Sequence, residues 1–229
     1  MKTIIITGAT GNLGTVVTRK FLDSGYSVIA TVITDAAKND IPAHENLQVE
    51  KVNLSDEAES AFFVQSVIDK YKQVDAALML VGGFMAGGIG VTSGADLKNQ
   101  FALNFETAYN ITRPLYLHMQ QKESGRLVFI GARPVLEAKD GKSMLAYGLT
   151  KSLLFKLAEY LNEDAKGKNI IATVVVPSTL DTPFNRKSMP AVNPADWVSP
   201  QQLAEVLEFV VSEKGSPLRE TLLKVYNNA

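Results

Sequence analysis

The sequence predicts an α/β fold: a single Rossmann-type, doubly wound parallel sheet with helices on both faces. Three observations predict it. Short apolar runs rich in β-branched residues alternate with longer amphipathic stretches, which is typical of βαβ units. A glycine-rich run directly follows the first apolar run. The 229 residues, 46% of them hydrophobic, suffice for the core of one such domain, so we expect residues 1–229 to form a single unit.

The apolar runs predict the strands, because each is short and bounded by polar or glycine-containing segments. In order they are Thr3–Thr7, Ser27–Ile33, Leu47–Val52, Ala76–Val81, Arg126–Ile130 and Ile170–Val176. The amphipathic stretches predict helices at Gly14–Ser24, Ser55–Tyr71, Ala95–Gln120, Tyr147–Asp164 and Pro200–Ser212. A last apolar piece, Thr221–Val225, is a candidate edge strand. Right-handed crossovers would then place a ligand crevice at the carboxyl ends of the strands.

Two stretches interrupt this alternation. Residues 82–90 contain five glycines directly after a predicted strand. Residues 178–200 form a long connection that contains several prolines after the last central strand. Both follow strand carboxyl ends, where ligands bind in this architecture. We therefore expect the second stretch to be a substrate loop.

The composition excludes several functional classes. The chain has 23 basic and 24 acidic residues, so no global charge favours nucleic acid or an anionic membrane as a partner. It has no cysteine and two distant histidines, His44 and His118, which argues against a metal site. The N-terminal apolar run ends at Gly8, far short of the roughly 20 residues of a membrane span. We expect a cytoplasmic protein that acts on a small molecule.

The glycine-rich run lies between the first strand and the first helix. Glycine permits a tight turn and lets the backbone approach a pyrophosphate, which a helix N-terminus attracts through its unpaired N–H groups. The strand before it and the helix after it are the context that such a motif requires. We expect the run to bind a dinucleotide through Gly8, Thr10, Gly11, Asn12, Leu13 and Gly14.

Tyr147 and Lys151 lie four residues apart in a predicted helix and so share one face. An ammonium near a phenol favours the ionised phenol, so we expect Lys151 to lower the pKa of Tyr147 from its ordinary value of about 10. The pair is a candidate catalytic acid–base unit. Two residues at this spacing recur by chance, and the pair gains its weight from the glycine-rich run upstream.

The glycine-rich run and the Tyr-x-x-x-Lys pair together resemble the short-chain dehydrogenase/reductase family over essentially the whole chain. The resemblance implies that Lys151 also holds the nicotinamide ribose and that Asn104 supports a proton-relay water. It further implies that Pro177 and Thr182 contact the nicotinamide, with Thr179 and Leu180 beside them. The family pairs its subunits through two long helices, which here implies a homodimer or a tetramer.

One departure from the family narrows the resemblance. Common members carry a serine after the fifth strand that donates to the substrate oxygen, whereas this chain has Ala132 there, within Gly131-Ala132-Arg133. The run from Val176 to Pro190, with Gly82-Gly83 and Trp197, resembles quinonoid dihydropteridine reductases, which also have alanine at that position. A conjugated acceptor spreads its charge over a ring, so an oxyanion donor matters less.

The cofactor is expected to be NADH or NADPH. Discrimination resides at the end of the second strand, where Val32 and Ile33 recognise neither ribose hydroxyl nor phosphate and Asp35 lies just beyond. The resemblance implies NADH, and the residues leave NADPH open. Further cofactor contacts are expected from Asn53 and Leu54, which should border the adenine, and from Gly82 and Gly83.

Several alternatives remain open. Arg133 and Arg186 are candidate substrate contacts or ordinary surface arginines, and Ser143 is a candidate replacement for the missing hydroxyl. Phe84, Met85 and Trp197 are candidates for the wall of a flat ring site or for loop packing. The acceptor is a quinonoid dihydropteridine or, for a general member of the family, a carbonyl or quinone. A non-catalytic NAD(P) sensor is the remaining alternative, against which the retained Tyr147, Lys151 and Asn104 argue.

Overall fold

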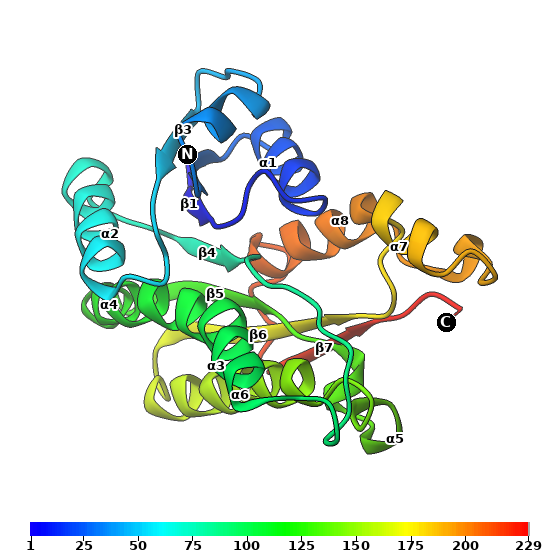
Figure 1. The fold of residues 1–229 in the computed structure, drawn as a ribbon. Helices are drawn as coiled ribbons and strands as arrows, with labels where there is room; N and C mark the ends of the chain where they lie inside the picture. The colour runs from blue at the N-terminus through cyan, green and yellow to red at the C-terminus, as the bar shows by residue number, and fades with distance from the viewer. Residues whose placement is uncertain (229) are drawn as a thin grey trace.

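The computed structural model describes residues 1–228 and contains one seven-stranded parallel sheet (Figure 1). The strand order is β3-β2-β1-β4-β5-β6-β7. The strands are β1 (Thr3–Ile6), β2 (Ser27–Val32), β3 (Leu47–Lys51), β4 (Ala76–Met79), β5 (Ser124–Ile130), β6 (Asn169–Pro177) and β7 (Leu222–Val225). The predicted fold class is confirmed, and the candidate edge strand is β7, parallel to β6.

Helices cover both faces of the sheet (Figure 1). They are α1 (Gly14–Asp23), α2 (Glu57–Tyr71), α3 (Gly94–Phe101), α4 (Thr107–Lys122), α5 (Ala138–Gly141), α6 (Leu145–Asp164), α7 (Pro183–Ser188) and α8 (Pro200–Val211). Short 3-10 turns are η1 (Ala36–Asp40), η3 (Arg133–Val135) and η4 (Pro194–Asp196), and η2 (Ala102–Glu106) is a π-helical turn.

Alternation along the strands builds two cores. In β1, Ile5 faces α2, α4 and α6, whereas Ile4 and Ile6 face α1 and α8. All three side chains are fully buried. A strand buried on both faces reads as a continuous apolar run, which is why β1 lacks the polar alternation of a surface strand.

The helix predicted over Ala95–Gln120 is wrong in detail. It consists of α3, the π-helical turn η2 and α4, so that the N–H of Thr107 donates to the carbonyl of Ala102, five residues back. The hydroxyl of Thr107 also donates to the carbonyl of Leu103 at 2.8 Å. An extra residue in the turn re-aims the side chains within it, and Asn104 is one of them.

The expected substrate loop contains regular structure. Residues 178–200 include α7 and η4, and the main chain around Leu180 pairs with Val198 in a short bridge. The loop ends where α8 begins, because the hydroxyl of Ser199 accepts from the N–H of Gln202 at 3.1 Å and caps the helix.

Two negative findings hold for residues 1–228. None of the helices is long and apolar enough to cross a membrane. No three side chains among histidine, cysteine, aspartate and glutamate gather as metal ligands would.

Candidate active site

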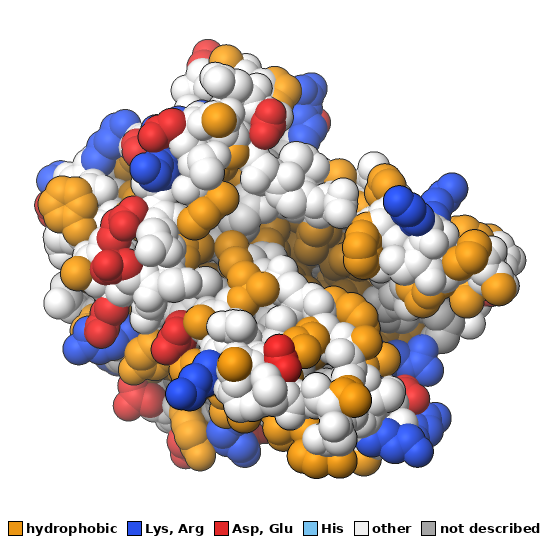
Figure 2. Space-filling view, in the orientation of Figure 1, with side chains coloured by type: hydrophobic (Ala, Val, Ile, Leu, Met, Phe, Trp, Pro, Cys, Tyr) orange, Lys and Arg blue, Asp and Glu red, His pale blue; other side chains and the backbone are white. Residues whose placement is uncertain are grey.

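The carboxyl ends of β1, β4, β5 and β6 meet at one edge of the sheet, where the strand order reverses between β1 and β4. The glycine-rich run follows β1, Gly82 and Gly83 follow β4, Ala132 follows β5 and the substrate loop follows β6. Figure 2 shows the molecule hollowed near its centre, with hydrophobic side chains lining the hollow. Strand ends at a reversal point are where this architecture binds its ligands.

The glycine-rich run folds into a turn that requires glycine. Gly8 has a φ of +68°, and a Cβ on Gly14 would lie 2.0 Å from the carbonyl oxygen of Gly8. The N–H of Gly11 donates to the same carbonyl at 3.0 Å. No side chain caps the first turn of α1 at Leu13, and no acidic residue lies there. The free N–H groups and the exposed glycine backbone fit a pyrophosphate.

Lys151 lies inside the protein on α6. Its side chain is only 4% exposed, and its Nζ donates to the carbonyl of Ile130, the last residue of β5, at 2.9 Å. Burial lowers the pKa of Lys151 from 10.5 to about 8. No carboxylate among the described residues pairs with it. A buried ammonium without a counter-ion is costly, which marks a functional position.

Asn104 is fully buried, and its side chain forms hydrogen bonds with the main chain of the segment after β4. Its Oδ1 accepts from the N–H of Gly83 at 2.9 Å, and its Nδ2 donates to the carbonyl of Gly83 at 3.0 Å. A second bond from Nδ2, to Oε1 of Gln100 at 2.9 Å, holds the amide in this orientation. A Cβ on Gly82 would lie 2.8 Å from Oδ1 of Asn104 and 2.9 Å from Nζ of Lys151. Gly82 therefore lets the main chain pass directly over both polar groups.

Tyr147 lies one turn before Lys151 on α6. Its ring meets the ring of Phe84 edge to face, with centroids 5.3 Å apart. Burial raises the pKa of Tyr147 to about 12. The expectation that Lys151 lowers this pKa is therefore wrong in this geometry, because desolvation of the phenol is the dominant effect. The phenol is protonated at neutral pH and is able to donate a proton.

Known proteins with similar sequences are dehydrogenases and reductases. A family model described as short chain dehydrogenase matches residues 2–193. The chain belongs to the short-chain dehydrogenase family. It is 27% identical to a dihydropteridine reductase from Dictyostelium discoideum, over 97% of this chain and 94% of that protein. It is 24% identical to an acetoacetyl-CoA reductase from an Acinetobacter species, over 94% and 92%.

Solved structures agree on the fold. The structure titled "ElxO with NADP Bound" superposes with a TM-score of 0.90 at 20% identity, over 98% of this chain and 96% of that one. As a member of the short-chain dehydrogenase family, this chain is an oxidoreductase of the kind that uses NAD(P). The family membership expected from the glycine-rich run and the Tyr-x-x-x-Lys pair is confirmed.

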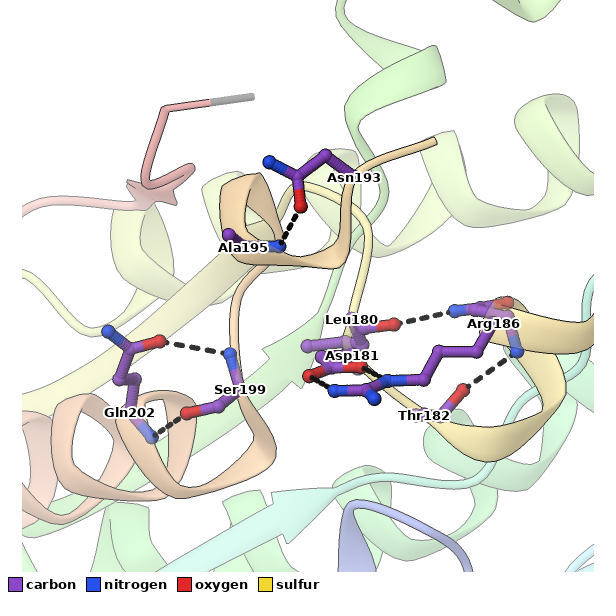
Figure 3. Close-up of polar contacts among 9 residues, drawn as sticks. Leu180, Asp181, Thr182, Arg186, Asn193, Ala195, Ser199 and Gln202 are labelled. Atoms are coloured by element: carbon purple, nitrogen blue, oxygen red, sulfur yellow. Dashed lines mark hydrogen bonds and ion pairs between the residues drawn. The ribbon is translucent and has the colours of Figure 1, made fainter. Parts of the chain in front are cut away.

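Hydrogen bonds between its own residues hold the substrate loop in shape (Figure 3). The hydroxyl of Thr182 caps α7 by accepting from the N–H of Asn185 at 3.2 Å, and the Asn185 amide donates to the carbonyl of Leu180 at 2.8 Å. Pro177 ends β6, and the carbonyl of Thr179 accepts from the N–H of Val198 at 3.0 Å. The hydroxyl of Thr182 keeps its own hydrogen free for a ligand, so the cap is compatible with the expected cofactor contact.

Two of the open polar candidates have partners within the protein. Arg186 forms a two-point ion pair with Asp181, at 2.6 and 2.7 Å (Figure 3), so its guanidinium is occupied inside the loop. The exposed hydroxyl of Ser143 donates to the carbonyl of Asp140 at 2.9 Å. Its own carbonyl accepts from the N–H of Gly87 at 2.8 Å. Ser143 therefore ties the glycine-dense segment to the start of α6.

The three candidates for the wall of a flat ring site, Phe84, Met85 and Trp197, differ in their exposure to solvent. Trp197 is buried at 4% exposure and packs within the protein, so it forms no open wall. Phe84 is 57% exposed and stands beside Tyr147. Met85 is half-buried next to it. Phe84 is the one of the three that pairs an exposed ring with the phenol.

The end of β2 carries charges of both signs. Ile33 is exposed, and the carboxylate of Asp35 pairs with Nζ of Lys38 at 3.1 Å and with that of Lys51 at 3.7 Å. After the neighbouring strand β3, Oδ1 of Asn53 accepts from the N–H of Ser55 at 3.3 Å in the turn before α2.

Sequence reasoning missed two groups at this site. Gln100 orients Asn104, and the spacing of four residues on one helix was the signal that could have found it. The carbonyl of Ile130 anchors Lys151, and no sequence pattern identifies a main-chain acceptor.

A separate surface cavity of about 420 Å³ lies between α1 and α8, lined by Thr15, Arg19 and Gln201 among others. This cavity includes none of the groups described above.

Proposed function

We propose that the protein is an NAD(P)H-dependent reductase that transfers hydride to a conjugated acceptor, a quinonoid dihydropteridine. The observation that carries the proposal is that the position after β5 holds Ala132, a buried residue without a hydroxyl, in a chain that retains Tyr147, Lys151 and Asn104. An alkoxide formed from a ketone gains much from a hydroxyl donor, whereas a ring that delocalises the incoming electron pair gains little. The identity to the Dictyostelium discoideum dihydropteridine reductase supports the same acceptor.

Each element of the site has a proposed task. The nicotinamide cofactor, when bound, supplies the hydride. The run from Gly8 to Gly14 holds the pyrophosphate, and Lys151 holds the ribose hydroxyls. The protonated phenol of Tyr147 donates the proton that balances the hydride. Asn104 keeps Gly82 and Gly83 in place over Lys151, and through them it positions the site.

Loops at both ends of the cofactor supply the remaining proposed contacts. Asn53 and Leu54 would border the adenine, and Thr179, Leu180 and Thr182 the nicotinamide. At the end of β2, Lys38 and Lys51 offset the charge of Asp35, so a 2′-phosphate meets less repulsion than a lone aspartate would impose. We expect NADH to be used and NADPH to be accepted, which the ratio of kcat/KM for the two cofactors measures.

A homodimer is proposed from two exposed apolar stripes. On α4, Tyr109 and Leu117 lie eight residues apart on one face. On α6, Leu149, Leu153 and Tyr160 lie at spacings of four and seven residues, which also places them on one face. Exposed stripes of this kind mark protein interfaces. Light scattering should give the mass of two chains, and Leu117→Arg with Tyr160→Arg should give one. The cytoplasm, whose reducing conditions suit a chain without cysteine, remains the predicted location.

A second candidate is a general carbonyl reductase, which the 24% identity to the Acinetobacter acetoacetyl-CoA reductase favours. The test is oxidation of NADH and of NADPH with quinonoid dihydropterin, simple quinones, ketones and acetoacetyl-CoA. Efficient turnover of the pterin with slow turnover of ketones supports the proposal. Turnover of ketones or acetoacetyl-CoA alone contradicts it. Tight cofactor binding without any turnover would identify a sensor instead.

A further inference from the structure

Arg133 stands at the carboxyl edge of the sheet with its donors unused. It begins η3, three residues after Ile130, whose carbonyl holds Lys151. Its side chain is 33% exposed. Among residues 1–228 its guanidinium donates no hydrogen bond, and its buried Nε has only a long ion pair, at 3.7 Å, with Oε1 of Glu137. A guanidinium carries five N–H donors in a fixed plane, so this side chain retains a large capacity to bind an acceptor.

The ring of Tyr226 fixes the direction of that guanidinium. Its centroid lies 5.2 Å from Cζ of Arg133, in a cation–π arrangement. Tyr226 follows β7, and its main chain is held by the hydroxyl of Ser178, which donates to the carbonyl of Tyr226 at 2.9 Å. Next to it, the amide of Asn227 donates to the carbonyl of Trp197 at 2.8 Å. The C-terminal segment is thus attached to the base of the substrate loop.

The nearest carboxylate does not satisfy Arg133. Oε1 of Glu137 lies 3.7 Å from Nε of Arg133, which is too long for a hydrogen bond. The same carboxylate pairs with Nζ of Lys139 at 2.8 Å. The pKa of Glu137 is held below its ordinary value mainly by Lys139 and less by Arg133. Lys139 holds the other oxygen of this carboxylate, Oε2. Glu137 therefore gives Arg133 a long ion pair but no hydrogen bond, and the guanidinium keeps its donors for a ligand.

We propose that Arg133, stacked on Tyr226, binds the carbonyl-bearing edge of the planar acceptor, on the side away from the nicotinamide. The inference rests on the proposed function and names how its substrate is recognised. Ala132 has no hydroxyl, so the adjacent Arg133 supplies the hydrogen-bond donors after β5. A rigid, planar donor beside an aromatic ring matches a flat ring whose edge carries a carbonyl oxygen.

The experiment measures binding as well as turnover. The probes are stable, non-quinonoid dihydropterin and diaminopteridine, in which an amino group replaces the ring carbonyl. Calorimetry gives the dissociation constant of each for the protein saturated with oxidised cofactor. Arg133→Met should weaken binding of dihydropterin about 10- to 100-fold, the usual effect of losing a charge-assisted hydrogen bond. It should leave binding of diaminopteridine unchanged.

Matched variants separate recognition from folding. Tyr226→Phe keeps the ring and should bind as the wild type does, whereas Tyr226→Leu should weaken binding of dihydropterin. Arg19→Met removes an exposed arginine that pairs with Asp23 on α1 and should have no effect. Circular dichroism and thermal melting check that each variant folds.

The outcomes are distinguishable. Equal dissociation constants for wild type and Arg133→Met, equal losses for both probes, or no binding of dihydropterin to the wild type would overturn the inference. Wild-type protein that binds dihydropterin through Arg133 but does not reduce the quinonoid form would overturn the proposed function alone.

Discussion

The buried ammonium of Lys151 should cost the protein stability, and the substitution Lys151→Met should restore it. Its pKa of about 8, against an ordinary 10.5, corresponds to about 3 kcal/mol that favours the unfolded chain at pH 7. Loss of the bond from Nζ to the carbonyl of Ile130 offsets about 1 kcal/mol of the gain. The variant should therefore be more stable than the wild type by about 2 kcal/mol, or about 4–8 °C in Tm.

The pH dependence of this gain identifies its cause. Between pH 8 and 10.5 the folded protein binds fewer protons at Lys151 than the unfolded chain does, so wild-type stability rises with pH across that window. The advantage of Lys151→Met should be complete below pH 8 and close to zero near pH 10. Urea unfolding at pH 7 and at pH 10 measures both values.

A matched control is Lys166→Met, which removes an exposed lysine paired with Glu163 at 2.6 Å. It should change stability by less than about 0.5 kcal/mol at either pH. Lys151→Met should also lose most of its reductase activity, because it removes the proposed contact to the ribose. A Lys151→Met variant that is less stable than the wild type at pH 7, or a gain that does not vary with pH, would refute this reasoning.

The other predictions concern the phenol, the close approach over Lys151 and the end of β5. Tyr147→Phe should fold and bind cofactor but lose at least about 100-fold in kcat, and unchanged turnover would show that the proton has another source. Gly82→Ala places a Cβ within 2.9 Å of Nζ of Lys151 and should reduce cofactor affinity. Gly90→Ala, whose Cβ would meet nothing within 4 Å, serves as its control in titrations of cofactor fluorescence. Ala132→Ser should add activity toward ketones, where a hydroxyl contributes about 2–4 kcal/mol, but none toward quinonoid acceptors; a large gain with quinonoid dihydropterin in steady-state assays would contradict the role assigned to that position.

The sequence predicts the parts of this site whose cause is local. Gly14 had to be glycine because the turn from β1 into α1 brings it against the carbonyl of Gly8, and the spacing of the run reveals this. Tyr147 and Lys151 share a helix face for an equally local reason. Each of these features depends on residues that are close in the chain.

The features that sequence reasoning missed depend on distant contacts. The sign of the pKa shift at Tyr147 depends on burial, to which Phe84 contributes from the segment after β4. The π-helical turn around Asn104 contains no proline or glycine that would have indicated it. Arg133 meets Tyr226 only because β5 and β7 flank β6 in the sheet. Such contacts are set by the fold as a whole.

The most direct test of the central claim is a competition for limiting NADH. Quinonoid dihydropterin and acetoacetyl-CoA are supplied together at equal concentration, and both reduced products are quantified when NADH is exhausted. Their ratio equals the ratio of the two kcat/KM values. Because the end of β5 offers a methyl group from Ala132 and no hydroxyl, tetrahydropterin should exceed the reduced acyl product by at least about 100-fold, which corresponds to about 3 kcal/mol of transition-state discrimination. Equal amounts, or an excess of the reduced acyl product, would contradict the account.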